Sequence, residues 1–261
     1  MSVWLAWYLA TGLLAGLLAG LMGVGGGLVI VPALLFAFAW QGVDPAHLAH
    51  LAVGTSLAAI VPIAIASLRA HHRHGAVEWP AVARLAPGLM LGAWGGAWLA
   101  KELDTQMLQR LFGAFLVLVA WQMVRSRRIQ AGRIRLGGIG LGVAGLGIGL
   151  VSGLVGIGGG TMTVPLLAWQ GRPLPRAVGT SAACGLPIAL AGALGFFYYG
   201  RRAALPEALG FIHWPALFPI AVLAVLAAPW GARLAHRLPV RQLRRLFALV
   251  LLAVAARLWL T

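Results

Sequence analysis

The chain has 261 residues, of which 61% are hydrophobic and 10% are charged, and its mean hydropathy is +0.91. Soluble domains carry about 25% charged residues, so this composition excludes an ordinary soluble fold and predicts a protein of the lipid bilayer. The single cysteine, Cys184, excludes a disulfide framework. At about 20 residues per span, the length allows roughly 8 to 10 transmembrane helices and no additional soluble domain.

The net charge of +15 is explained mostly by the positive-inside rule, which gathers Lys and Arg in cytoplasmic loops. Basic and aromatic residues do not alternate as they do on surfaces that stack nucleobases, so we expect no nucleic-acid partner. The first 22 residues have neither a positive start nor a small-residue cleavage site. They predict a retained first span and not a signal peptide.

Three sequence blocks occur twice, in the same order, in the two halves of the chain. Residues 16–34 match 149–167 at 11 of 19 positions, 52–66 match 177–191 at 10 of 15, and 96–112 match 231–247 at 9 of 17. We interpret this as a duplication: a first transmembrane repeat at 1–124, a basic cytoplasmic linker at 125–135 and a second transmembrane repeat at 136–261.

Each half has five apolar elements, which predicts an all-α polytopic membrane protein. In the first half they cover 3–22, 25–40, 48–68, 80–100 and 107–124, and in the second 136–155, 158–170, 177–199, 211–235 and 242–260. Because five is odd, the second half would enter the membrane from the opposite side. The result is an inverted repeat, an arrangement common among secondary transporters.

The basic residues test this topology. If all ten elements cross, 15 of the 20 Lys and Arg residues lie on one face and 5 on the other; if the short second element of each half does not cross, the split is 9 to 11. The positive-inside rule therefore favours ten crossings, with both termini outside and the linker in the cytoplasm. Elements 25–40 and 158–170 are short enough to be half-helices or re-entrant segments.

A cluster of glycines interrupts each half and is followed by a proline. The residues concerned are Gly23, Gly25, Gly26, Gly27 and Pro32 in the first half, and Gly156, Gly158, Gly159, Gly160 and Pro165 in the second. Glycine costs about 1 kcal/mol and proline about 3 kcal/mol inside a helix, so these segments should unwind. A helix that restarts after them presents free N–H groups and the positive end of its dipole, which bind anions without a charged side chain.

Close helix packing is the alternative role for glycine. It is the role we expect for the six glycines at spacings of four residues: Gly12, Gly16, Gly20, Gly145, Gly149 and Gly153. Four glycines within five residues exceed what close approach requires, so for the clusters we favour a binding role.

A Gly-Thr-Ser triplet lies inside the third element of each half. The triplets are Gly54, Thr55 and Ser56, and Gly179, Thr180 and Ser181. Their hydroxyls could bond to their own helix at the i−4 carbonyl, or they could donate to a substrate in a cavity shared by the two halves. Thr161 and Thr163 have no hydroxyl counterpart in the first half, so such a site would be asymmetric.

Few other residues could bind a cation or a metal or take part in catalysis. All five acidic residues fall at expected loops, which argues against a cation pump. Cys184 has no histidine or aspartate nearby in sequence, which predicts a core residue and not a nucleophile. The run His71, His72 and His74 is more typical of a solvated loop than of a metal site. We therefore expect no enzyme activity, no metal and no cofactor.

The duplicated glycine block and the Gly-Thr-Ser triplet, each followed by a proline, resemble the sulfite exporter TauE/SafE family of bacterial membrane permeases. The resemblance covers essentially the whole chain. It implies a secondary transporter of the inner membrane for a small anion, such as sulfite or another sulfur oxyanion or organosulfonate, with the glycine clusters and triplets as binding residues. The family is usually given seven or eight spans, fewer than the ten expected from the charges.

The resulting hypothesis is an alternating-access anion permease in the bacterial inner membrane, with the substrate held between two inverted halves. One alternative is an accessory subunit or scaffold that moves no solute, and the sequence also leaves a homo-oligomer open. The expected partners are thus a small anion and the lipid bilayer.

Overall fold

The computed structural model of the chain describes residues 2–22, 25–125, 136–234 and 240–260. Within these ranges the chain is almost wholly helical, as its apolar runs predict. The first half forms α1 Ser2–Met22, α2 Gly27–Trp40, α3 Leu48–Arg73, α4 Trp79–Glu102 and α5 Thr105–Val124. The second half forms α6 Gly138–Val155, α7 Gly160–Trp169, α8 Leu174–Gly200, a hairpin of β1 Ala208–Leu209 and β2 Ile212–His213, α9 Trp214–Leu234 and α10 Val240–Leu260. The all-α membrane class is confirmed.

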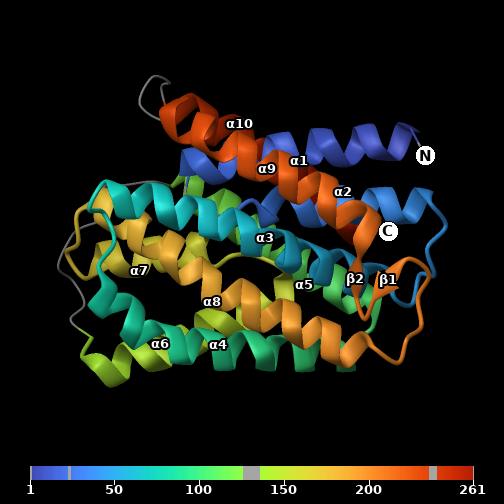
Figure 1. Cartoon of the computed structure of the whole chain (residues 1–261), viewed down its shortest axis with the longest axis horizontal. Helices are drawn as coiled ribbons and strands as arrows, with labels where there is room; N and C mark the ends of the chain where they lie inside the picture. Colours follow the sequence, from blue (N-terminus) through green and yellow to red (C-terminus); the bar gives the residue numbers. More distant parts are fainter. Residues whose placement is uncertain (1, 23–24, 126–135, 235–239, 261) are drawn as a thin grey trace.

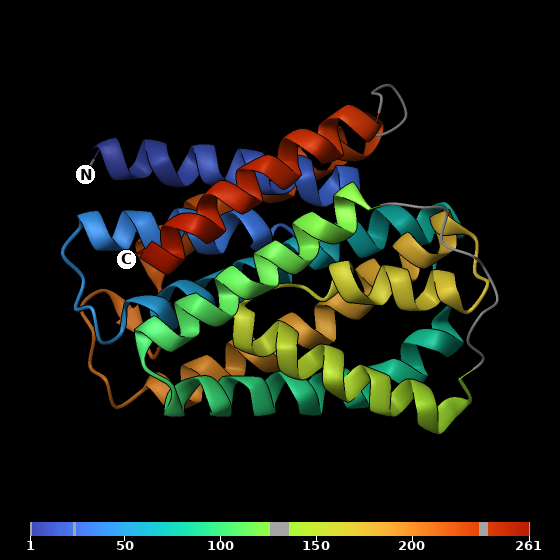
Figure 2. The same ribbon diagram turned by 180° about the vertical axis from the view of Figure 1, so that it is seen from behind.

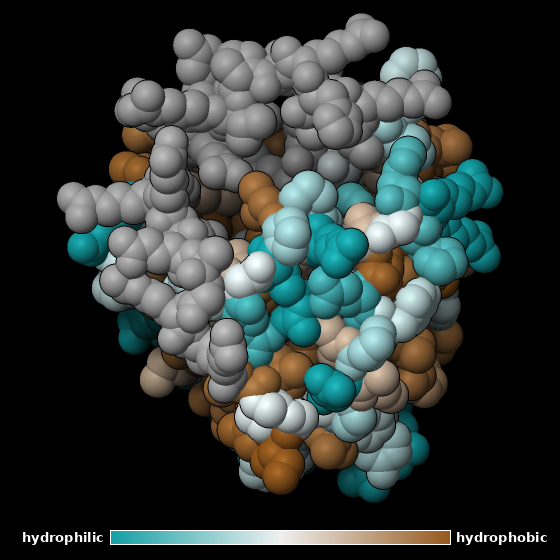
Figure 3. Space-filling view, turned by 90° about the vertical axis from the view of Figure 1, so that its left-hand side faces the viewer, coloured by the Kyte–Doolittle hydropathy of each residue, from teal (hydrophilic) through white to brown (hydrophobic). Residues whose placement is uncertain are grey.

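The helices run side by side along the long axis of the molecule (Figure 1). Both termini lie at one end of the bundle, together with the hairpin and the α4–α5 corner (Figure 2). The helices that flank the basic linker reach the opposite end, where hydrophilic residues gather in the middle of the face (Figure 3). We call these the terminus end and the linker end. This arrangement agrees with ten elements of alternating direction, whereas the side of the membrane on which each end lies stays a prediction.

Ten full crossings are nevertheless too many, because α2 and α7 are half-helices. They have 14 and 10 residues, which makes them about 21 and 15 Å long at 1.5 Å per residue. The hydrocarbon core of a bilayer is about 30 Å thick. Within the described residues, six helices are long and apolar enough to cross it, namely α1, α3, α5, α6, α8 and α9.

The most extensive helix contacts join the two halves of the sequence. α1 packs along α9, α6 packs along α4, and α3 and α8 pack against each other at the centre of the bundle. Under the sequence repeat, α1 corresponds to α6 and α9 to α4, so the first two contacts are equivalent. The halves interlock, and their division into two repeats and a linker stays a prediction.

Glycines let the backbones of α4 and α6 approach closely. A Cβ atom at Gly145 would lie 2.7 Å from the carbonyl oxygen of Leu85, and one at Gly92 would overlap the carbonyl oxygen of Leu146. Gly149 and Gly153 face the α4 backbone in the same way, and Gly12 and Gly16 of α1 face the α9 backbone at Ile220 and Ala224. The packing role expected for Gly12, Gly16, Gly145, Gly149 and Gly153 is confirmed, and Gly92, which the sequence analysis did not single out, shares it.

Gly92→Ala is therefore expected to lower the free energy of unfolding by about 1–3 kcal/mol, because the methyl group would press into the α6 backbone. Gly95→Ala on the same helix is the control, since nothing lies within 4 Å of its Cβ position. It should leave stability unchanged or raise it by up to about 1 kcal/mol. Thermal unfolding in detergent measures both variants, and equal melting temperatures would contradict the interface.

Candidate functional site

Both glycine clusters break their helices, as the sequence predicts. α1 ends at Met22 and α2 begins at Gly27, and α6 ends at Val155 and α7 begins at Gly160. Gly25 and Gly26 have φ angles of 79° and 77°, and Gly156 and Gly159 have 81° and 72°. This left-handed backbone favours glycine because it has no Cβ atom. Gly23 lies outside the described residues.

The two prolines lie elsewhere than expected. Pro32 and Pro165 are inside α2 and α7 and not in the unwound turns. A proline lacks the N–H that would bond the carbonyl four residues earlier, so each leaves one helix carbonyl without its usual donor. The glycines alone therefore break the helices, and the prolines modify the first turns that follow.

The two turns touch each other at the centre of the bundle. A Cβ atom at Gly25 would lie 3.3 Å from the Cα of Gly158, and one at Gly27 would lie 2.6 Å from the carbonyl oxygen of Gly156. Gly26 and Gly159 are the residues that precede α2 and α7, and neither provides a side-chain cap. Two helix N-termini, each with uncapped N–H groups and a positive dipole end, thus begin at the same place.

A small cavity lies beside the paired turns. It is lined by Ala19, Gly25, Ile60, Ile63, Ala64, Ser67, Gly158, Ser181, Ala182 and Gly185. The cavity volume open to a water molecule is about 10 Å³, which holds about one water. An oxyanion of several heavy atoms needs more room, so this conformation is closed around the site.

Ser181 is the notable polar group of this cavity. Its side chain is 1% exposed, and its hydroxyl has no hydrogen-bond partner among the described residues. An unpartnered buried hydroxyl costs about 1–3 kcal/mol, so its presence calls for a reason. The hydroxyl of Thr161, in the first turn of α7, is also buried and without a partner in the described part of the chain.

The other triplet residues have partners away from the cavity. The Thr55 hydroxyl accepts a hydrogen bond of 2.9 Å from the backbone N–H of His213, and the Thr180 hydroxyl accepts one of 3.0 Å from that of Glu78. Ser56 donates to the carbonyl oxygen of Gly156 at 2.9 Å, so it supports the second glycine turn. The expectation that the hydroxyls line a cavity therefore holds in geometry for Ser181 alone.

The triplet glycines make room for these same contacts. A Cβ atom at Gly54 would overlap the backbone of Phe211, and one at Gly179 would lie 2.5 Å from the carbonyl oxygen of Ala76. Each triplet thus holds the loop that precedes α9 or α4, and the two contacts are equivalent under the repeat. The Thr163 hydroxyl also has a partner, since it donates to the carbonyl oxygen of Gly159, the residue that precedes its own helix.

Thr55→Val and Thr180→Val are both expected to lower the free energy of unfolding by about 1–3 kcal/mol, because each leaves a backbone N–H without its acceptor. Thr105→Val is the control, since that hydroxyl bonds to Ala46 at a solvent-accessible site. It should cost less, because water can replace the lost partner. Thermal unfolding of the three variants checks the comparison; an equal effect in all three would contradict it.

The sequence analysis did not single out Ser67 or Gly185, which also line the cavity. Helix periodicity could have found Gly185, which follows Ser181 by four residues, about one turn. Ser67 has no such signal, because Ser56, the expected site residue of the same helix, does not line the cavity.

The lining contains none of the five acidic residues of the chain. Cys184 is fully buried in α8. No group of three His, Cys, Asp or Glu side chains that could hold a metal lies within the described ranges. The polar chemistry at the cavity is thus that of backbone amides and hydroxyl groups, which suits an anion better than a cation.

Comparison with known proteins identifies the family. The sulfite exporter TauE/SafE family profile matches residues 8–258. The chain belongs to this family. A probable membrane transporter protein of Haemophilus influenzae is 36% identical over 241 residues, which cover 91% of this chain and 91% of that protein.

More distant relatives carry similar descriptions. A probable membrane transporter protein of Methanocaldococcus jannaschii is 27% identical over 88% of this chain and 85% of its own length. The probable inner membrane transporter protein TsaS of Comamonas testosteroni is 26% identical over 68% of this chain and 70% of its own length. No solved structure matches the chain. The family match and the names of these relatives support a membrane transporter rather than an enzyme, and the six long apolar helices of the described residues indicate a multi-pass membrane protein.

Proposed function

We propose that this protein is a secondary permease that carries a small anion, sulfite or another sulfur-containing oxyanion or organosulfonate, across the bacterial inner membrane. The observation that carries the proposal is the meeting of two uncapped helix N-termini beside the unpartnered Ser181 hydroxyl. N–H groups, a dipole end and a hydroxyl donor match the oxygen atoms of an oxyanion. The family name and a lining without carboxylates support the same choice.

Alternating access would follow from the interlocked halves. The cavity is closed in this conformation, so an anion can enter only after one end of the bundle opens. Movement of α1 and α9 relative to α4 and α6 would open the ends in turn, with the glycine turns as the site between them. Inverted halves would make the two open forms similar in energy, which is the usual design of such transporters.

Reconstitution of the purified protein in liposomes tests this function. Influx of radiolabelled sulfite, thiosulfate, sulfate and a small sulfonate is measured against vesicles without protein. We expect saturable flux of at least one anion, with competition by the others. If the folded protein carries none of them, the sulfur-anion assignment fails, and an accessory subunit that moves no solute becomes the better interpretation.

A further inference from the structure

An ion pair lies at the linker end of the bundle, near the candidate site. The Nε of Arg172 donates to Oε2 of Glu78 at 2.6 Å, and another guanidinium nitrogen of Arg172 donates to the side chain of Gln170. Arg172 and Glu78 are 19% and 28% exposed. The pair joins the loop that leads into α8 to the residue that precedes α4, so it ties together two elements from different halves.

The pair lies close to the cavity. The backbone N–H of Glu78 donates to the Thr180 hydroxyl, and the next residue, Ser181, lines the cavity. The ion pair is thus connected to the cavity lining through Glu78 and Thr180.

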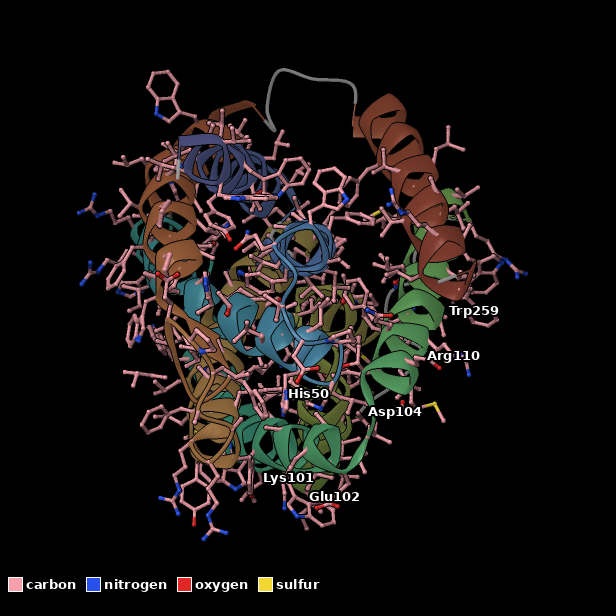
Figure 4. The ribbon with its side chains drawn as sticks, turned by 90° about the vertical axis from the view of Figure 1, so that its right-hand side faces the viewer. His50, Lys101, Glu102, Asp104, Arg110 and Trp259 are labelled. Atoms are coloured by element: carbon pink, nitrogen blue, oxygen red, sulfur yellow. The ribbon has the colours of Figure 1, made fainter. Side chains whose placement is uncertain are left out.

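The carboxylate of Glu78 is not needed for the loop contact itself. The equivalent position in the second half, 135 residues later, is His213, whose backbone N–H makes the same bond to Thr55. At both ends of the bundle the loop contact is thus made by a backbone N–H and not by a side chain. Among the five acidic residues, Glu78 is the one at the linker end, whereas Glu102 and Asp104, for example, lie at the terminus end (Figure 4).

We propose that Arg172 is an anion-binding residue at the linker-end mouth, and that Glu78 occupies its guanidinium until the transported anion replaces it. This inference rests on the proposed function and adds an entry site to it. Arginine forms two parallel hydrogen bonds with carboxylates and with oxyanions alike, so one can substitute for the other. Both side chains are partly exposed, so water reaches the separated groups and lowers the cost of the exchange. Replacement of Glu78 breaks the side-chain contact between the α7–α8 loop and the start of α4, while the backbone bond to Thr180 remains, and the released loop gives access to Ser181.

The first test measures opening without any substrate. Ser181→Cys places a thiol in the cavity, and its alkylation by a maleimide is followed in the purified full chain; the parent protein with its buried Cys184 gives the background. Adding Glu78→Gln or Arg172→Gln should accelerate alkylation at least about fivefold, because either change favours the open form. Arg176→Gln, which removes an exposed arginine at the same end, should not. Unchanged rates in both ion-pair variants overturn the proposal.

The second test uses sulfite influx in liposomes. Glu78→Gln should lower the KM for sulfite, because it removes the competing carboxylate, whereas Arg172→Gln should raise the KM about tenfold or more. Arg172→Lys should restore part of the affinity, and Arg176→Gln should leave the KM unchanged. A purely structural ion pair would affect both variants in the same direction, so parallel changes of KM overturn the proposal.

The two tests separate this inference from the proposed function. If wild-type vesicles carry no sulfite, the proposed substrate fails, but the alkylation rates still decide whether the ion pair closes the mouth. If wild-type transport is normal and the KM values of the two variants do not diverge, the permease assignment stands and the entry site is rejected.

Discussion

Gly25→Leu is expected to reduce anion flux to below about one tenth of the wild-type rate. Gly25 has a φ of 79°, a left-handed conformation that costs a residue with a side chain about 1–2 kcal/mol, so leucine should shift the turn out of its present shape. A side chain at this position would also press on Gly158 across the paired turns, where the Cβ would lie 3.3 Å from the Cα. Radiolabelled sulfite influx into liposomes measures the loss.

Gly42→Leu separates the effect on the site from backbone strain. Gly42 has a φ of 72°, but nothing lies within 4 Å of its Cβ position. The substitution should lower stability by a similar amount through strain and leave the flux of folded protein within about twofold of wild type. Equal flux in the two variants, at equal amounts of folded protein, would show that the glycine turns are not the site.

The helices and their breaks could be predicted from the sequence because their causes are local. The apolar element expected at 25–40 is α2 Gly27–Trp40, and that expected at 107–124 is α5 Thr105–Val124. The spacing of glycines also separates their two roles. Glycines four residues apart lie on one helix face and meet a neighbouring backbone, whereas clustered glycines leave no stable helix.

The partners of the triplet side chains could not be predicted from the sequence, because these contacts join segments that are distant in the chain. Thr55 meets His213, 158 residues away, and Ser56 meets Gly156, 100 residues away. Neighbouring residues of a helix point about 100° apart, so the two hydroxyls reach different partners. A sequence repeat indicates which positions are equivalent, but not which loop of the other half each one contacts.

The number of helices that cross the membrane could also not be predicted from the charges. The charge distribution indicates on which end each loop lies, and the structure has the loops arranged that way. Charge carries no information on whether an element between two loops is long enough to span. The 10 residues of α7 are not, since the glycine turn takes the place of its remaining length.

Ser181→Ala is expected to raise the KM for the transported anion about tenfold without destabilising the protein. The Ser181 hydroxyl has no partner among the described residues, so its removal breaks no hydrogen bond of the closed conformation. A hydrogen bond to a charged ligand contributes about 1.5–3 kcal/mol, and its loss should appear only when the anion is bound. Sulfite influx at varied concentration gives the KM, and thermal unfolding gives the stability.

Ser56→Ala at the equivalent position gives the opposite pattern. The Ser56 hydroxyl donates to the carbonyl oxygen of Gly156 at 2.9 Å in a buried site, so its loss should cost about 1–3 kcal/mol of stability. The same chemical change in the two halves thus separates an anion ligand from a support of the turn. If both variants lose stability and retain the wild-type KM, both hydroxyls are structural, and the anion must be held by the turn backbone alone.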